Sequence, residues 1–219
     1  MTVEVRDAPQ PLPQLTSAPV LITVEGIDGA GKSTLIAGLA NRFPDAQVLR
    51  EPGGVELSER LRTLVKDPDL AIGDRAEALI YAAARAQLVD ERLKPLLDEG
   101  SVVLLDRFTD SSLAYQGAGR QLGVDAVRQL NAFGTGGIEP DRTLLLRLSP
   151  EEAAGRVGHR GPQDRIEGAP DAFWTACARA YDELAQAEPG RWIVLDATLP
   201  APAVLAEAVA QLAPLLDGP

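Results

Sequence analysis

Short apolar runs alternate with segments of helical periodicity along most of the chain. Five runs have the length and composition of buried strands, at residues 20–24, 47–50, 101–105, 143–148 and 192–195. Apolar residues recur at helical spacing in six further segments, at residues 34–40, 57–65, 76–97, 111–133 (in pieces), 173–184 and 201–216. Pro150 is expected to begin another helix, and Pro95 to bend or end the helix that contains it. Strands that alternate with helices predict an α/β fold, with a five-stranded parallel sheet and helices on both faces.

The first apolar run leads into a glycine-rich turn, GIDGAGKS, at residues 26–33. Glycines that follow a strand and precede a helix let the backbone surround a phosphate, and the positive end of the helix dipole lies at the same place. In this pattern the lysine reaches the β- and γ-phosphates and the serine hydroxyl binds Mg²⁺. A chance match in an ordinary strand–helix turn is the alternative. We predict that a nucleoside triphosphate binds at Gly26, Ile27, Asp28, Gly29, Ala30, Gly31, Lys32, Ser33 and Thr34.

The length of 219 residues is typical of one domain, which we expect to cover residues 20–217. Residues 1–19 contain four prolines and little apolar periodicity, which predicts a mobile leader. Residues 158–170 combine charged residues with glycine and proline, and such a segment is expected to be a surface loop. No internal repeat or second domain is indicated.

The net charge of −11 limits the partners that the chain could bind. A general nucleic-acid or anionic-membrane surface needs a basic face, so neither is expected, and phosphate binding must rely on a few directed arginines. One cysteine and one histidine exclude an internal disulfide bond and make no zinc site. No apolar run is long enough to span a bilayer and no signal sequence is evident, so we expect a cytoplasmic enzyme.

Several blocks of sequence, beyond the glycine-rich turn, resemble the thymidylate kinases in order and spacing. They are REPGG at residues 50–54, AAARAQ at 82–87, DRF at 106–108, SSLAYQG at 111–117, DRIE at 164–167 and LDAT at 195–198. The resemblance covers residues 20–216, and the DRF and SSLAYQG blocks are its most specific part. It implies the P-loop nucleoside monophosphate kinase fold, a homodimer, and transfer of the γ-phosphoryl group of ATP to dTMP, giving ADP and dTDP for dTTP synthesis.

The resemblance also implies a binding site for dTMP. Tyr81 matches an aromatic residue that stacks on thymine, where close bacterial relatives commonly have phenylalanine, and Arg85, one helical turn away, matches a residue that binds the base edge. Tyr115 matches an aromatic residue against the 2′ carbon of the sugar. Without the resemblance, the two tyrosines would be assigned to the core and Arg85 to the surface. The predicted dTMP-binding residues are Asp28, Arg50, Glu51, Pro52, Tyr81, Arg85, Arg107, Ser111, Ser112, Tyr115 and Gln116.

Catalytic arginines are expected in two places. Arg107 should bind the acceptor phosphate, and the loop at residues 158–170 corresponds to the lid of the family. No arginine lies between Gly26 and Lys32, whereas the lid contains Arg160 and Arg165, so the chain resembles the bacterial members with the catalytic arginine in the lid. We favour Arg160 for the transferred phosphate and Arg165 for a supporting contact. The predicted catalytic set is Lys32, Asp28, Arg107, Arg160 and Arg165.

The remaining site residues concern ATP and the metal. Arg156 and Ala197 are expected to border ATP. Asp106 ends an apolar strand and is expected to hold Mg²⁺ together with Ser33, in part through water. Its alternative role is a carboxylate that caps the turn or pairs with Arg107.

Two other functions stay open from the residues alone. A kinase for another small acceptor would share the P-loop but would not phosphorylate dTMP. A P-loop switch protein would retain nucleotide and turn it over slowly, although the NKxD base-recognition motif of GTPases is missing from the sequence.

Overall fold

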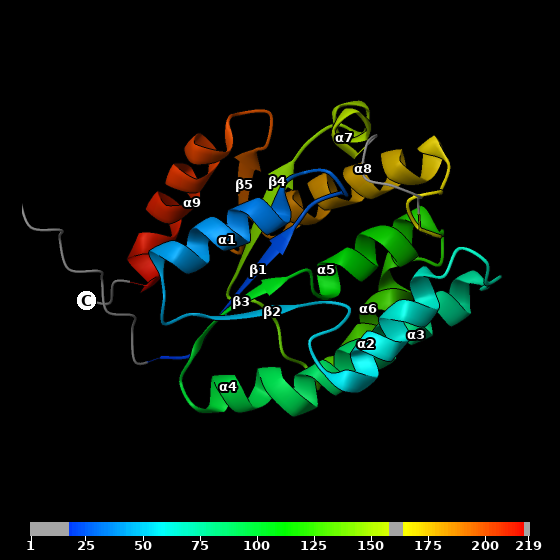
Figure 1. Ribbon diagram of the computed structural model, residues 1–219, viewed down its shortest axis with the longest axis horizontal. Helices are drawn as coiled ribbons and strands as arrows, with labels where there is room; N and C mark the ends of the chain where they lie inside the picture. The colour runs from blue at the N-terminus through cyan, green and yellow to red at the C-terminus, as the bar shows by residue number, and fades with distance from the viewer. Residues whose placement is uncertain (1–17, 158–163, 217–219) are drawn as a thin grey trace, which may run out of the picture.

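The computed structural model describes residues 18–157 and 164–216 (Figure 1). Most of the predicted leader, and Arg160 with part of the predicted lid, therefore lie outside the described residues. All five predicted strands are present and form one parallel sheet in the order β2–β3–β1–β4–β5. Their bounds are β1 Val20–Glu25, β2 Gln47–Arg50, β3 Val102–Asp106, β4 Arg142–Arg147 and β5 Trp192–Asp196.

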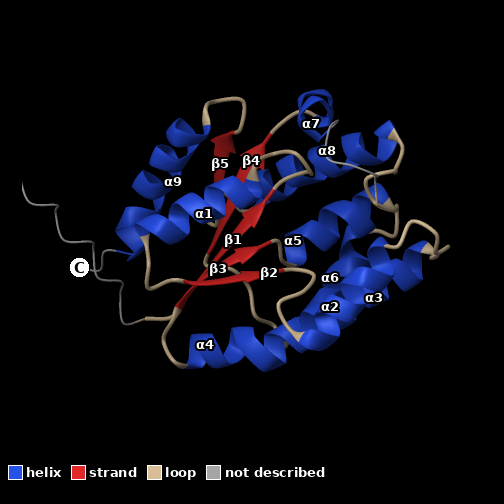
Figure 2. Ribbon diagram, viewed as in Figure 1, coloured by secondary structure: helices blue, strands red, loops and turns tan. Residues whose placement is uncertain are grey.

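Helices cover both faces of this sheet (Figure 2). Val20, Ile22 and Val24 of β1 share an apolar cluster with residues of α1 and α9, whereas Leu21 packs in a second cluster with residues of α3 and η1. Alternate residues of β1 thus pack against helices on opposite faces of the sheet. The predicted α/β architecture is confirmed. The helical elements are α1 Lys32–Arg42, α2 Glu56–Lys66, α3 Asp74–Leu88, η1 Val89–Leu93, α4 Lys94–Asp98, α5 Thr109–Ser112, η2 Leu113–Gly119, α6 Val124–Thr135, α7 Pro150–Val157, α8 Asp171–Ala187 and α9 Ala201–Leu216.

Of the two outcomes expected for Pro95, a bent helix or an ended one, the second was wrong. The helical path continues from α3 through η1, a wider π-helical turn, and into α4, which ends only at Asp98. Pro95 lies in the first turn of α4, directly after the wider turn of η1, and a helix tolerates a residue without an N–H best in its first turn.

The predicted helix at residues 111–133 is present in pieces, as expected. A short helix, α5, leads into the π-helical η2, and α6 begins after Gly123, whose positive φ of 89° turns the chain. Within the described part of the chain, no helix is both long enough and apolar enough to cross a membrane.

The sheet brings the functional blocks of the sequence together at one edge. Val24 of β1 and Arg50 of β2 both lie in register with Asp106 at the end of β3. In a parallel sheet all carboxyl ends point the same way, so the loops that follow β1, β2 and β3 are neighbours. Ligands of open α/β sheets bind at this edge.

The close packing of η2 on α8 provides a test of the fold. A Cβ at Gly119 would lie 2.6 Å from Phe173 Cε2 and 2.8 Å from Cys177 Sγ. We expect Gly119→Ala to lower the free energy of unfolding by about 1–3 kcal/mol, because an extra methyl group overpacks this contact. Gly155→Ala in α7 is the matched control, since a Cβ added there would meet nothing within 4 Å. That control should stabilise by about 0.5–1 kcal/mol. Urea denaturation measures both, and equal shifts would contradict the packing.

Candidate active site

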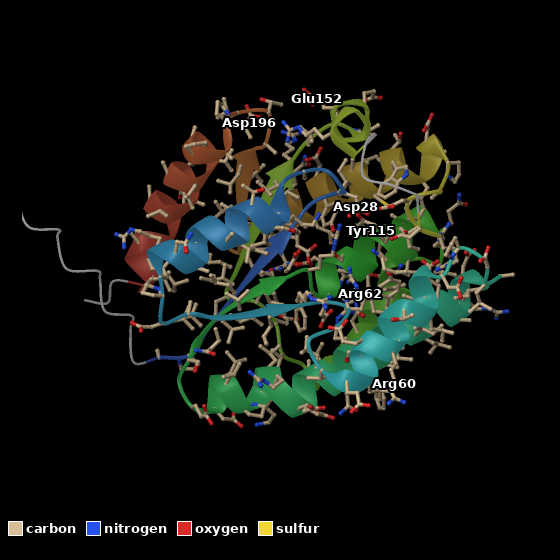
Figure 3. The ribbon with its side chains drawn as sticks, viewed as in Figure 1. Asp28, Arg60, Arg62, Tyr115, Glu152 and Asp196 are labelled. Carbon is tan, nitrogen blue, oxygen red and sulfur yellow. The ribbon has the colours of Figure 1, made fainter. Side chains whose placement is uncertain are left out.

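A cavity of about 500 Å³ lies at the carboxyl ends of β1, β2 and β3. The loop after β1, the loop after β2, α2, α3, the segment after β3 and the residues just before α8 all contribute to its wall. Figure 3 labels Asp28, Tyr115 and Arg62, which come from three of these segments and all line the cavity. The sequence blocks that carry the family resemblance therefore converge on this cavity, except LDAT at residues 195–198, which contributes no residue to its wall.

The glycine-rich turn has the backbone geometry expected of an anion-binding loop. Gly26 and Gly31 have φ values of 138° and 101°, and a Cβ at Gly26 would lie 2.7 Å from the carbonyl oxygen of Leu146, so glycine is needed there. Lys32 is buried and donates from Nζ to the carbonyl oxygens of Gly26 at 3.0 Å and Ile27 at 2.9 Å. Burial and the nearby guanidinium of Arg107 lower the pKa of Lys32 to about 8.

Arg107 lines the cavity and contacts residues from two parts of its wall. One guanidinium nitrogen, Nη1, donates to Gly26 O at 3.1 Å and to Ser111 Oγ at 3.0 Å, and the other, Nη2, donates to Asp28 Oδ1 and to the Tyr115 hydroxyl. The guanidinium also lies 5.0 Å from the centre of the Tyr115 ring. Burial alone would raise the pKa of Asp28, but Arg107 and Lys32 outweigh it and hold the pKa below its usual value. Arg107 thus connects the P-loop to the far half of the cavity.

Glu25, the last residue of β1, holds the chain around Arg107 in place. Its carboxylate accepts hydrogen bonds from Phe108 N at 2.8 Å, Ser111 Oγ at 2.6 Å and the Tyr181 hydroxyl at 2.9 Å. Arg107 has a φ of 66°, a backbone conformation that non-glycine residues rarely adopt without support. Burial and the charge of Asp110 raise the pKa of Glu25. Sequence reasoning assigned no role to Glu25 or Tyr181, because a buried acid and a distant tyrosine carry no motif of their own.

The other half of the cavity contains the predicted aromatic and base-edge residues. Tyr81 and Arg85 both line it from α3. Arg85 is only 2% exposed, and it donates to Glu51 Oε2 at 2.7 Å, Asn131 Oδ1 at 2.6 Å and Phe108 O at 2.9 Å. Its orientation is therefore fixed, unlike that of a surface arginine. Burial raises the pKa of Glu51 to about 7, although its ion pair with Arg85 acts in the opposite direction.

Four residues of α5 and η2 complete this half of the wall. Ser111, Ser112, Tyr115 and Gln116 are buried and line the cavity, as do Glu51 and Pro52 from the loop after β2. Tyr115 packs edge-on against Phe173 and Trp174 at 5.8 Å, so it belongs to the core and to the cavity wall at once. The two roles that the sequence left open for Tyr115, a core residue or an aromatic residue against the sugar, are therefore compatible.

Two predicted arginines have partners within the protein. Arg50 lines the cavity, but its guanidinium binds Glu59 at 2.5 Å and the Pro52 carbonyl oxygen at 3.3 Å. Arg165 donates to Glu77 Oε2 at 2.5 Å and to the Val65 carbonyl oxygen at 2.9 Å. For both residues, contact with a phosphate stays a prediction.

Two further cations line the cavity that the sequence did not single out. Arg62 donates to Pro52 O at 2.9 Å, and Lys66 pairs with Asp164 at 2.6 Å. Both lie on α2, where basic residues on an amphipathic helix normally indicate a solvent-exposed face. Only the position of α2 beside the cavity shows that they face a ligand site.

A second, smaller cavity of about 370 Å³ adjoins the other side of the P-loop. Its wall includes Gly29, Ala30 and Thr34, and also Arg156 and Ala197, which the sequence predicted to border ATP. Arg156 donates from Nη2 to the Ala197 carbonyl oxygen at 2.8 Å. The P-loop therefore separates two spaces, one on each side of the phosphate-binding backbone.

Few groups in the cavity could hold a metal ion. Ser33 and Asp106 both line it, and Asp106 Oδ1 is buried without a partner in the described residues. Within those residues, no group of three or more histidine, cysteine, aspartate or glutamate side chains could hold a metal. A hard cation here would take one or two oxygen ligands from the protein, which is typical of Mg²⁺ bound with phosphates.

The fold and the cavity together define a P-loop kinase of nucleoside monophosphates. A thymidylate kinase family model matches residues 24–208. The thymidylate kinase of Deinococcus radiodurans is 48% identical over 185 residues, which are 83% of this chain and 90% of that protein. The thymidylate kinase of Lactobacillus delbrueckii subsp. bulgaricus is 43% identical over 196 residues, 86% of this chain and 92% of that protein.

A solved structure agrees with this assignment. The crystal structure of thymidylate kinase from Ehrlichia chaffeensis matches with a TM-score of 0.72 at 27% identity, and the match covers 89% of this chain and 99% of that one. The chain belongs to the thymidylate kinase family.

The lowered pKa of Lys32 can be detected as proton uptake. A polyphosphate beside Nζ favours the charged ammonium, so ATP binding should raise this pKa again. We expect uptake to increase between about pH 7.5 and about pH 9, because the free protein is then increasingly neutral at Lys32. Calorimetric titration in buffers of different ionisation enthalpy measures it. Lys32→Arg is the control, since arginine stays charged; an equal increase in that variant would contradict the assignment.

Proposed function

We propose that this protein transfers the γ-phosphoryl group of ATP to dTMP, giving ADP and dTDP. We propose further that the phosphoryl group is transferred in the larger cavity, which Arg107 lines. Beyond membership of the family, one observation supports this proposal most strongly. A single guanidinium contacts the P-loop at Gly26 and, at Ser111, the half of the cavity that is predicted to bind dTMP. Donor and acceptor phosphates are thereby brought to the same cation.

The P-loop holds the donor. Its backbone N–H groups and the amino end of α1 face the β- and γ-phosphates. Lys32, which donates to two loop carbonyl oxygens, exchanges those partners for phosphate oxygens. Arg156 and Ala197 border the remainder of ATP in the smaller cavity.

Arg107 binds the acceptor phosphate, and Asp28 keeps its guanidinium in position. A planar guanidinium suits two oxygens of one phosphate. The acceptor is already an oxyanion near neutral pH, so no general base is required, and positioning and charge neutralisation are the main contributions of the protein. Arg50, Arg62 and Lys66 lie around the same space and add positive charge.

The thymine binds between Tyr81 and Arg85. Three of the five N–H donors of Arg85 have protein partners among the described residues, which leaves donors for a carbonyl oxygen of the base. Glu51 and Pro52 close the pocket, Ser111, Ser112 and Gln116 lie along the base edge and the ribose, and Tyr115 stands against the 2′ carbon of the sugar.

Mg²⁺ fits the Ser33 hydroxyl of the P-loop and the unpartnered Asp106 Oδ1. When bound, it neutralises charge on the phosphates of ATP. Arg160 is the candidate for the charge of the transferred group, and it lies outside the described residues. Arg165 would have to leave Glu77 before it could support that charge.

We also propose that the enzyme is a cytoplasmic homodimer. Large apolar side chains are exposed on α2, α3 and α6, which lie side by side (Figure 1): Phe133 is 91% exposed, Leu79 57% and Leu57 46%. Burying such side chains against a second copy would remove apolar surface from water.

A coupled ADP-release assay tests the reaction. With ATP and Mg²⁺, dTMP should be the best acceptor among the natural nucleoside monophosphates. Lys32→Met should lower turnover by at least about 100-fold, because it removes a charge from the transferred phosphoryl group. Circular dichroism of that variant should match the parent. Phosphorylation of another monophosphate in preference to dTMP would overturn the proposal.

The dimer surface has its own test. Phe133→Glu places a charge in the proposed contact and should shift the sedimentation coefficient from that of a dimer to that of a monomer. Val48→Glu is the matched control, because Val48 is also exposed (47%) but lies on β2, away from these helices. A monomeric parent, or a dimer that survives Phe133→Glu, would reject this surface.

A further inference from the structure

Glu77, in the first turn of α3, is a fully buried carboxylate with three partners on other segments. Arg165 Nη2 lies 2.5 Å and Arg120 Nη2 3.1 Å from its Oε2. Gln116 Nε2 donates to its Oε1 at 2.8 Å. Neither the phosphates nor the base needs Glu77 as a ligand, because it is absent from the cavity wall. Its action on the ligand must therefore pass through its partners.

Of these partners, Gln116 faces the cavity. A side-chain amide has a donating end and an accepting end, and its orientation is set by its neighbours. Both oxygens of Glu77 accept hydrogen bonds, Oε2 from two guanidinium groups and Oε1 from Gln116 Nε2. The NH₂ end of Gln116 must then point to Glu77, which leaves the carbonyl oxygen as the end available to a ligand.

We propose that Glu77 is a positioning residue for base specificity, because it fixes the amide of Gln116 with its oxygen toward the base. The inference rests on the proposed function, in which Gln116 lies along the base edge. Thymine has a hydrogen on N3 and donates there, whereas cytosine has an unprotonated N3 and accepts. An amide oxygen at this place accepts from thymine and repels cytosine. Arg85 selects independently at position 4 of the ring, since it presents only donors.

The same contacts explain why Arg120 and Arg165 are needed. Arg120 also lies 4.5 Å from the centre of the Phe173 ring, and Arg165 donates to Val65 O, so both guanidinium groups are held by other contacts. Two guanidinium groups thus compensate the buried carboxylate of Glu77. Neutral groups around it would leave the orientation of Gln116 undetermined.

Glu77→Gln tests the proposal because it should reverse the amide. The oxygen of the new side chain would accept from the two arginines, so its NH₂ would face Gln116. Gln116 would then turn its oxygen toward the new side chain at position 77 and its NH₂ toward the base. We expect the ratio of kcat/KM for dTMP to kcat/KM for dCMP to fall by about tenfold or more, the effect of about one hydrogen bond. This ratio does not depend on the fraction of enzyme that is folded.

A swapped pair provides the decisive comparison. In Glu77→Gln combined with Gln116→Glu, the carboxylate at position 116 accepts from Gln at position 77 and presents an acceptor to the base, so the preference for dTMP should return. Asp74→Asn is the matched control: Asp74 pairs with Arg120 at 3.7 Å from the same turn of α3 and has no contact with Gln116 in the described residues. Its ratio should equal that of the parent.

The outcomes separate this inference from the reaction itself. If the parent fails to phosphorylate dTMP, the proposed function falls. If the parent is active and Glu77→Gln keeps its ratio, or the swapped pair does not regain it, only the role of Glu77 falls. Should Glu77→Gln not yield folded protein, Gln116→Met removes the amide without disturbing the arginines, and an unchanged ratio in that variant overturns the proposal.

Discussion

The guanidinium of Arg107 is the interaction on which the site depends. It bonds to the P-loop through Gly26 and Asp28 and to the acceptor half through Ser111 and Tyr115. The protein has a net charge of −11, so its overall field repels both substrates. Attraction must come from cations held at short range, and Arg107 is the cation that both halves of the cavity share. In the proposed reaction, its position therefore determines how far apart the two phosphates can lie.

The parallel sheet explains how the position of Arg107 is fixed. Arg107 N donates to Val24 O at 3.1 Å, so the turn after β3 is bonded directly to the strand that carries the P-loop. Glu25, the next residue, binds Phe108 and Ser111 on the other side of the arginine. Two neighbouring strands and one carboxylate thus hold the backbone of Arg107 in a conformation it would not adopt alone. A site on independent loops would lose much of this precision.

The sequence predicted those parts of the molecule that depend on local pattern. All five strands and the P-loop follow from apolar runs and from glycines at fixed spacing. The path of the helix through Pro95 did not, because tolerance of a proline depends on the wider turn before it. Glu25, Glu77 and Tyr181 were missed for a different reason. Each acts through contacts between segments far apart in the chain, such as the 156 residues between Glu25 and Tyr181, and no periodicity records such a contact.

Three buried carboxylates, Glu25, Glu51 and Glu77, share an arrangement that stability alone does not explain. Removing a charged group from water costs several kcal/mol, and apolar residues of similar volume are often at least as stable in its place. Each of these acids accepts a hydrogen bond from a group that lines the cavity: Ser111, Arg85 and Gln116, respectively. Glu25 and Glu77 therefore lie behind groups that face the ligand, whereas Glu51 also lines the cavity itself. Since a polar group that is already oriented loses little entropy on binding, the cost of burying these acids is offset where the substrate binds rather than in the fold.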